Sequence, residues 1–116
     1  MVLSLEVAVD RFPLQKPFTI SRGSVSELEL VTATIRDGAH AGRGECRPYA
    51  RYGETVASVT AQIEAVRGFV EAGGDREGLL QAMPPGAARN AVDCALWDLE
   101  AKTAGKSVQE LLGLPP

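Results

Sequence analysis

The chain has 116 residues, the length of one small domain, and its composition, 45% hydrophobic and 23% charged, is that of an ordinary globular protein. Its net charge is -3 and its basic residues are scattered, which argues against nucleic-acid binding because that function needs a Lys/Arg-rich stripe. No apolar run in the sequence is long enough to span a bilayer, so we expect no membrane segment.

The first half of the chain alternates between apolar and polar residues, which is typical of half-buried β-strands. The pattern begins with SLEVAVDRF at Ser4, so we interpret the N-terminus as a strand and not as a signal peptide. LELVTATIRD repeats the pattern, and the Asp37-Gly38 pair after it predicts a tight turn into a third strand, HAGRGEC. Between the first two strands, PFTISRGSVSE is longer than a tight hairpin requires, and we expect a functional loop there.

After Tyr52-Gly53 the apolar residues recur at three and four positions, the spacing of amphipathic helices. Gly and Pro pairs divide this half of the chain, and Ser107 with Glu110 predicts a capping box for a final short helix. The expected longer helices run from about Glu54 to Ala72, from the cap Asp75 to Met83, and from about Ala87 to Ala104. Strands followed by helices predict an α+β fold in which helices cover one face of a three-stranded antiparallel sheet.

The last long helix carries Asp93, Cys94, Asp98 and Glu100, which raises the question of a metal site. Asp93 and Asp98 are five residues apart, so a helix with 3.6 residues per turn directs them away from each other. Asp93 and Glu100 lie two turns apart, too far for one ion. The spacing therefore argues against a metal site, and Asp98 with Lys102 predicts a surface ion pair worth about 0.2–0.5 kcal/mol.

The same helix is rich in alanine, and its Trp97 lies off the apolar stripe. Small residues allow another element to approach closely. We therefore expect a second packed surface on this helix, formed with a partner that the chain does not supply. The stripe itself consists of Ala88, Val92, Ala95, Leu96 and Leu99.

Cys46 and Cys94 are far apart in the sequence and have no close-spaced partner. We interpret them as two buried, reduced and inert thiols of a cytoplasmic protein. His40 is the single histidine, and its turn-like setting in DGAHAG indicates a solvated loop residue.

The combination of GRGECRPYARYGET with AARNAVDCALWDLEAKTAGKSVQELLG resembles the N-terminal part of the enolase superfamily, in its muconate-lactonising branch. The Gly-x-Gly-Glu signature (Gly42, Gly44, Glu45) and the Ala-x-Trp-Asp helix (Ala95 to Asp98) are shared widely in that superfamily. PFTISRGS and CRPYARYGE are more particular, and within the branch they resemble most the L-Ala-D/L-Glu dipeptide epimerases. The resemblance covers the whole chain.

The resemblance implies a capping domain that closes over the mouth of a (β/α) barrel. Residues 1–86 would form the sheet and helices of this capping domain, and residues 87–116 a helical segment that leads to a barrel absent from this chain. It also implies Mg2+ as the cofactor of the full-length enzyme, with the metal ligands and two acid/base lysines on barrel strands. We therefore expect no catalytic residue and no metal ligand here, and no activity from these 116 residues alone.

The resemblance places four residues of this chain in two loops that cover the substrate. Arg22 is expected to bind the acidic end of a dipeptide, because a guanidinium pairs well with a carboxylate; the alternative is a solvated loop arginine. Phe18 is expected either in the core under its loop or as an apolar wall of the pocket. Tyr49 and Tyr52 either cover the substrate or anchor their loop through buried rings and bonded hydroxyls, and anchoring is favoured for Tyr49.

Other interpretations keep the scaffold and change the reaction. The chain could cap a cycloisomerase, an N-acylamino-acid racemase or a succinylbenzoate synthase of the same branch, or act as a non-catalytic binding module. The expected partners are a small dipeptide and the C-terminal barrel domain, with no nucleic acid and no membrane. Assembly as a homo-oligomer stays open.

Overall fold

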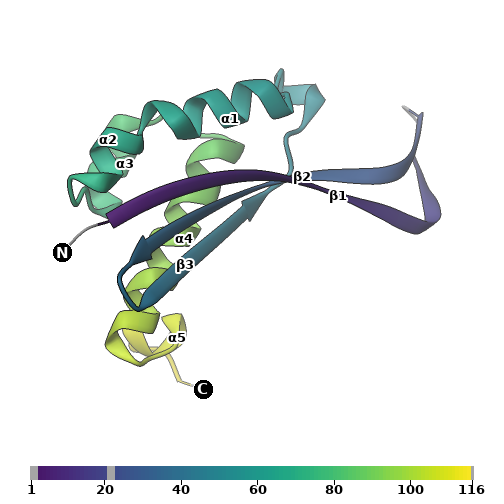
Figure 1. The fold of residues 1–116 in the computed structure, drawn as a ribbon. Coiled ribbons are helices and arrows are strands. Elements are labelled where there is room, and N and C mark those ends of the chain that lie inside the picture. Colours follow the sequence, from purple (N-terminus) through teal and green to yellow (C-terminus); the bar gives the residue numbers. More distant parts are fainter. Residues whose placement is uncertain (1–2, 21–22, 116) are drawn as a thin grey trace.

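The alternating segments form three antiparallel strands in the order β1-β2-β3, as expected. The computed structural model describes residues 3–20 and 23–115, with the backbone alone for residues 17, 18, 20 and 23–26. The strands are β1 (Leu3–Ile20), β2 (Gly23–Asp37) and β3 (His40–Cys46). Helices pack on one face of this sheet (Figure 1), where they bury the apolar strand residues. The buried hydrophobic residues of the strands are Leu5, Val31, Ala33, Ile35 and Cys46.

Strands β1 and β2 continue past the third strand as a paired arm that extends beyond the helices (Figure 1). The expectation of a long loop over PFTISRGSVSE is wrong, because Phe18 pairs with Val25 and the ladder continues to Ile20 and Gly23. The register shifts between Pro13 and Phe18, where proline supplies no N–H to a ladder. The outer part of the arm extends beyond the helices, and Phe12 on it is exposed.

The second half of the chain is helical, as the apolar spacing predicted. After a short 3-10 turn, η1 (Ala50–Tyr52), it forms α1 (Val56–Ala65), α2 (Arg67–Glu71), α3 (Arg76–Ala82), α4 (Ala87–Ala104) and α5 (Val108–Leu111). The single helix expected from Glu54 to Ala72 is wrong in one respect: it breaks at Val66, whose N–H bonds to Ile63 O at 3.2 Å. Both pieces still bury apolar residues at that spacing, Val59 and Ile63 in α1 and Val70 in α2.

Local end signals act as the sequence indicated. The side chain of Asp75 accepts a hydrogen bond from Gly78 N at the start of α3, and Ser107 with Glu110 forms a capping box at α5. Gly105 ends α4 in the left-handed conformation, with φ of 68°. Among the described residues, no helix is both long and apolar enough to cross a membrane.

Helix α4 lies directly on β3 at two glycines. A Cβ atom at Gly44 would lie 1.8 Å from Ala91 O, and one at Gly42 would lie 2.2 Å from Ala95 O. No side chain fits at either position, so helix backbone contacts strand backbone. Ala91 and Ala95 are fully buried by this contact. The burial of Ala95 is as expected from the apolar stripe, whereas Ala91, which lies off that stripe, has its partner in β3 and not outside the chain.

The outer edge of β3 is occupied by side chains of α4. Asp98 Oδ2 accepts hydrogen bonds from Arg43 N at 2.9 Å and from Lys102 Nζ at 2.9 Å. Lys102 Nζ also donates to Ala41 O at 3.0 Å. The predicted pair of Asp98 with Lys102 is confirmed, and it also satisfies edge groups that another strand could otherwise pair with.

The outer edge of β1 is occupied in the same way by α2. Leu5 N donates to Glu71 Oε2 at 2.9 Å, and Arg67 donates to Leu5 O. Arg67 is itself held by Glu64 at 2.8 Å and Glu71 at 3.4 Å. Helix α2 begins directly after the break at Val66. Its charged residues Arg67 and Glu71 are the ones that bond to the sheet edge at Leu5.

We predict that Gly44→Ala lowers the free energy of unfolding by about 3 kcal/mol, the upper end of the usual cost of overpacking, because the obstructing atoms are backbone. Urea denaturation measures the change. Gly68→Ala is the matched control, since an added Cβ there has nothing within 4 Å, and it should cause no loss. Equal stability of the two variants would contradict the close approach of α4 to β3.

We also predict a pH-dependent contribution from Asp98. Partial burial raises the pKa of Asp98, but the hydrogen bonds from Arg43 N and Lys102 and their positive charges outweigh it and hold the pKa below its ordinary 3.8. A pKa lowered by folding gives stability that is complete above the ordinary value and is lost as pH falls through the lowered one.

Asp98→Asn should therefore cost about 1 kcal/mol of unfolding free energy at pH 7, an estimate that allows for solvent screening, and less below about pH 4. Urea titrations at both pH values test this. Asp10→Asn is the control, because Asp10 is exposed and no contact involving its carboxylate is seen in the described part of the chain. A cost for Asp98→Asn that does not depend on pH would refute the role of the charge.

Candidate functional site

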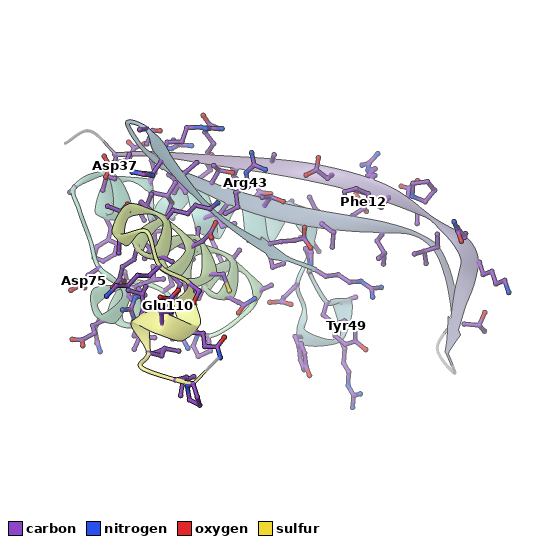
Figure 2. The ribbon with its side chains drawn as sticks, turned by 90° about the horizontal axis from the view of Figure 1, so that it is seen from below. Phe12, Asp37, Arg43, Tyr49, Asp75 and Glu110 are labelled. Carbon is purple, nitrogen blue, oxygen red and sulfur yellow. The ribbon has the colours of Figure 1, made fainter. Side chains whose placement is uncertain are left out.

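Two exposed segments lie at the same end of the molecule: the arm of β1 and β2, and residues 47–54 between β3 and α1. Figure 2 shows Phe12 on the arm and Tyr49 on this loop at one end, with Asp37 and Asp75 toward the other. A cavity of about 440 Å³ lies between them. It is lined by Glu27 and Glu29 of the arm and by Arg47, Pro48, Ala50, Glu54, Thr55, Val56 and Ala57. These two segments are the ones for which the sequence predicted substrate contact.

The loop is built around η1 (Ala50–Tyr52), a single 3-10 turn. Tyr52 N donates to Tyr49 O at 3.0 Å and Gly53 N donates to Ala50 O at 2.9 Å. Gly53 follows with φ of 74°, the left-handed region that favours glycine. No residue of η1 is buried, so hydrophobic packing does not fix the turn.

The two tyrosines contact each other. Their ring centroids are 5.3 Å apart with an interplanar angle of 45°, and the residues are 37% exposed for Tyr49 and 77% for Tyr52. Among the described residues, neither hydroxyl makes a hydrogen bond to protein. Both side chains are exposed in this structure, and the choice between covering the substrate and anchoring the loop stays a prediction.

Glu54 holds the loop instead. Its Oε1 accepts from Tyr49 N at 3.0 Å and its Oε2 accepts from Ala87 N at 2.8 Å, at the start of α4. Sequence reasoning placed Glu54 at the beginning of a helix and missed this bridge. No local pattern signals a contact with a residue 33 positions away.

The structure describes only the backbone of one of the remaining two predicted site residues. Arg22 lies outside the described residues. The backbone of Phe18 pairs with Val25 in the arm, and its side chain is likewise outside the description. Of the four predicted site residues, the structure thus brings Tyr49 and Tyr52 together on one loop, and the roles of Arg22 and Phe18 stay predictions.

The acids of α4 are engaged separately. Asp98 contacts β3 as described above, whereas Glu100 pairs with Arg76 at 3.0 Å. The Arg76 guanidinium also lies 3.3 Å from the centroid of the Trp97 ring, so Trp97 has a partner within the chain. A cavity of about 650 Å³ at this position lies far from the exposed loop. Within residues 3–20 and 23–115, no group of three His, Cys, Asp or Glu side chains could hold a metal ion.

The sequence matches a family described as the mandelate racemase / muconate lactonizing enzyme, N-terminal domain, over residues 3–113. It is 47% identical over 111 residues to L-Ala-D/L-Glu epimerase of Escherichia coli K12, a match that covers 96% of this chain and 35% of that protein. It is 42% identical over 86 residues to N-acetyl-D-glutamate racemase of Pseudoalteromonas sp, a match that covers 72% of this chain and 27% of that protein.

Solved structures show the same fold. An enolase family member from Agrobacterium tumefaciens with homology to dipeptide epimerases, bound to sodium and L-Ala-L-Glu, matches with a TM-score of 0.93 and 54% identity over 97% of this chain and 35% of its own. Dipeptide epimerase from Methylococcus capsulatus, complexed with Mg and L-Arg-D-Lys, matches with a TM-score of 0.83 and 30% identity. This match covers 97% of this chain and 35% of that protein. The chain spans about a third of the length of these proteins.

The two cysteines differ in burial: Cys46 is buried and Cys94 is exposed, so the expectation of two buried thiols is wrong for Cys94. Cys46 is buried, and burial, followed by the negative charges of Glu54 and Glu45, raises its pKa to about 11. Cys94 is exposed on α4, and partial burial followed by the charge of Asp93 raises its pKa. Both thiols are free. Accessibility therefore separates them, while neither is activated as a nucleophile.

We predict that Ellman's reagent at pH 8 modifies one thiol per native chain. Cys94 should react, whereas Cys46 is shielded and only about one in a thousand of its thiols is ionised at that pH. In Cys94→Ser the native protein should stay unmodified until urea unfolds it. Equal, rapid reaction of two thiols in the native protein would contradict the burial of Cys46.

Proposed function

Because the chain belongs to the mandelate racemase / muconate lactonizing enzyme family as its N-terminal domain, we propose that it is the substrate-capping domain of an L-Ala-D/L-Glu dipeptide epimerase. The observation that carries the proposal is the match of nearly the whole chain to an epimerase of that specificity. The exposed arm and the loop at residues 47–54 support it, because both lie at one end where a substrate could be covered.

In this proposal the chain binds and encloses the substrate and leaves the bond-making to a barrel domain. Epimerisation of a dipeptide removes an α-proton on one face of the carbon and returns a proton on the other, which requires a base and an acid on opposite faces. When bound, Mg2+ supplies stabilisation for the negative charge that develops next to the carboxylate. The described residues of this chain do not fit a metal ion, so its ligands would belong to the barrel.

The residues of this chain would act on the acidic part of the substrate. We assign Arg22 to the side-chain carboxylate of the terminal glutamate, because a guanidinium forms paired hydrogen bonds with a carboxylate. Tyr49 and Tyr52 would cover the substrate and exclude water, and their exposure supports this role. Phe18, in the arm, would supply an apolar wall of the pocket.

One further candidate has its own support. The similarity to N-acetyl-D-glutamate racemase favours an N-acylamino-acid racemase as the alternative. The two substrates are related, because L-Ala-Glu is itself a glutamate acylated on nitrogen. The shared chemistry is an N-acylated glutamate with two carboxylates, and the alternatives differ in whether the acyl group carries an ammonium. A cytoplasmic location also belongs to the proposal, supported by the two free cysteines.

We predict that Arg22→Ala in the complete enzyme lowers kcat/KM for L-Ala-L-Glu about 100-fold, the loss of a charge-assisted contact. L-Ala-L-Leu, which lacks the side-chain carboxylate, should change less than about threefold. Steady-state epimerisation assays with both substrates measure this. Arg36→Ala serves as the control, since Arg36 pairs with Glu6 at 3.5 Å on the sheet. Equal losses for both dipeptides would refute the assignment of Arg22.

The same assays separate the two enzyme proposals. The wild-type enzyme should act on L-Ala-L-Glu with a kcat/KM at least tenfold above that for N-acetyl-L-glutamate. The opposite preference would replace the epimerase by the racemase.

A further inference from the structure

The loop that carries Tyr49 and Tyr52 is attached to the fold through one carboxylate. Glu54 N donates to Tyr49 O at 3.3 Å, and Tyr49 N donates to Glu54 Oε1 at 3.0 Å, so the two residues close the base of the loop. The second oxygen of the same carboxylate accepts from Ala87 N at 2.8 Å. One side chain thus joins the loop base to the first residue of α4.

No buried contact of η1 replaces this attachment. None of its residues is buried, and the two tyrosine rings contact each other. The direction in which the loop points is therefore set mainly by its base. Charge-assisted hydrogen bonds from two N–H groups are stronger and more directional than neutral ones, which suits a carboxylate to this task.

Helix α4 is a rigid support for the loop. Its N-cap residue Gly86 has no side chain to satisfy the first N–H groups, and Glu54 supplies an acceptor from outside the helix. A Cβ at Gly86 would lie 3.1 Å from Glu54 Oε2, so a residue with a side chain would crowd the carboxylate. Because α4 in turn rests on Gly42 and Gly44 of β3, the loop is aligned with the sheet through the helix.

We propose that Glu54 is a positioning residue that sets the orientation of Tyr49 and Tyr52 over the substrate. This inference rests on the proposed function for its effect on catalysis, whereas its effect on the loop does not depend on the reaction. Since both carboxylate oxygens of Glu54 accept hydrogen bonds from backbone N–H groups, its loss should weaken substrate binding and leave the chemical step nearly unchanged.

The first test is hydrogen exchange of the full-length protein. In Glu54→Gln one carboxylate oxygen becomes an NH2 group, which cannot accept a hydrogen bond, so at most one of the two N–H groups keeps its partner. We expect amide exchange in peptides covering residues 47–55 and 84–90 to become about tenfold faster. Glu77→Gln makes the same chemical change on an exposed residue of α3 and should leave both peptides unchanged.

A second variant removes the donor without altering the loop. Ala87→Pro deletes the N–H at the first position of α4, where proline is well tolerated, so the helix should persist. Exchange in residues 47–55 should rise about threefold. If Glu54→Gln does not fold, this variant alone tests whether the bond between Glu54 and Ala87 holds the loop. Unchanged exchange of the loop in a folded variant would overturn the proposal.

The third readout separates positioning from general destabilisation. For L-Ala-L-Glu, Glu54→Gln should raise KM at least fivefold while kcat stays within about twofold, because the barrel residues are untouched. A fall in kcat at constant KM would indicate only a loss of active protein and would overturn the positioning role. If the wild-type protein does not epimerise the dipeptide, the proposed function fails, and the exchange experiments still decide whether Glu54 holds the loop.

Discussion

The contact between β3 and α4 is the constraint on which the rest of the structure depends. Two glycines, Gly42 and Gly44, let the helix backbone contact the strand backbone. A side chain at either position would prevent this close approach. This proximity lets Asp98 bond to the edge of β3 and brings the first N–H of α4 within reach of Glu54. The exposed loop is therefore supported, through one helix, by a glycine pair on a strand.

Helix side chains occupy part of each outer edge of the three-stranded sheet. Charged side chains from α2 and α4 bond to the outer backbone groups of β1 and β3, so no unpaired row remains at Leu5 or Arg43 for another strand. Each of these side chains comes from a helix that also packs apolar residues against the sheet. The same helices thus bury the sheet face and bond to part of each of its edges.

Local signals in the sequence predicted the features that depend on neighbouring residues. The strand alternation, the Asp37-Gly38 turn and the capping box at Ser107 needed only a few residues each, and all three are confirmed. Features that depend on distant residues were missed. The Gly-x-Gly motif could be matched to a family but not to its partner Ala91, and the bridge from Glu54 to Ala87 has no local pattern. The paired arm was mistaken for a loop because its register shift interrupts the alternation.

The way the loop is held also bears on what it can do. A segment that covers a ligand must keep its side chains accessible, so it cannot be fixed by burying them. In this chain Tyr52 is 77% exposed while the base of its loop is tied by hydrogen bonds to one carboxylate. The attachment involves backbone N–H groups, which every residue except proline provides. Side chains at the tip can therefore change without loss of the attachment, which separates the surface that sets specificity from the contacts that hold it in place.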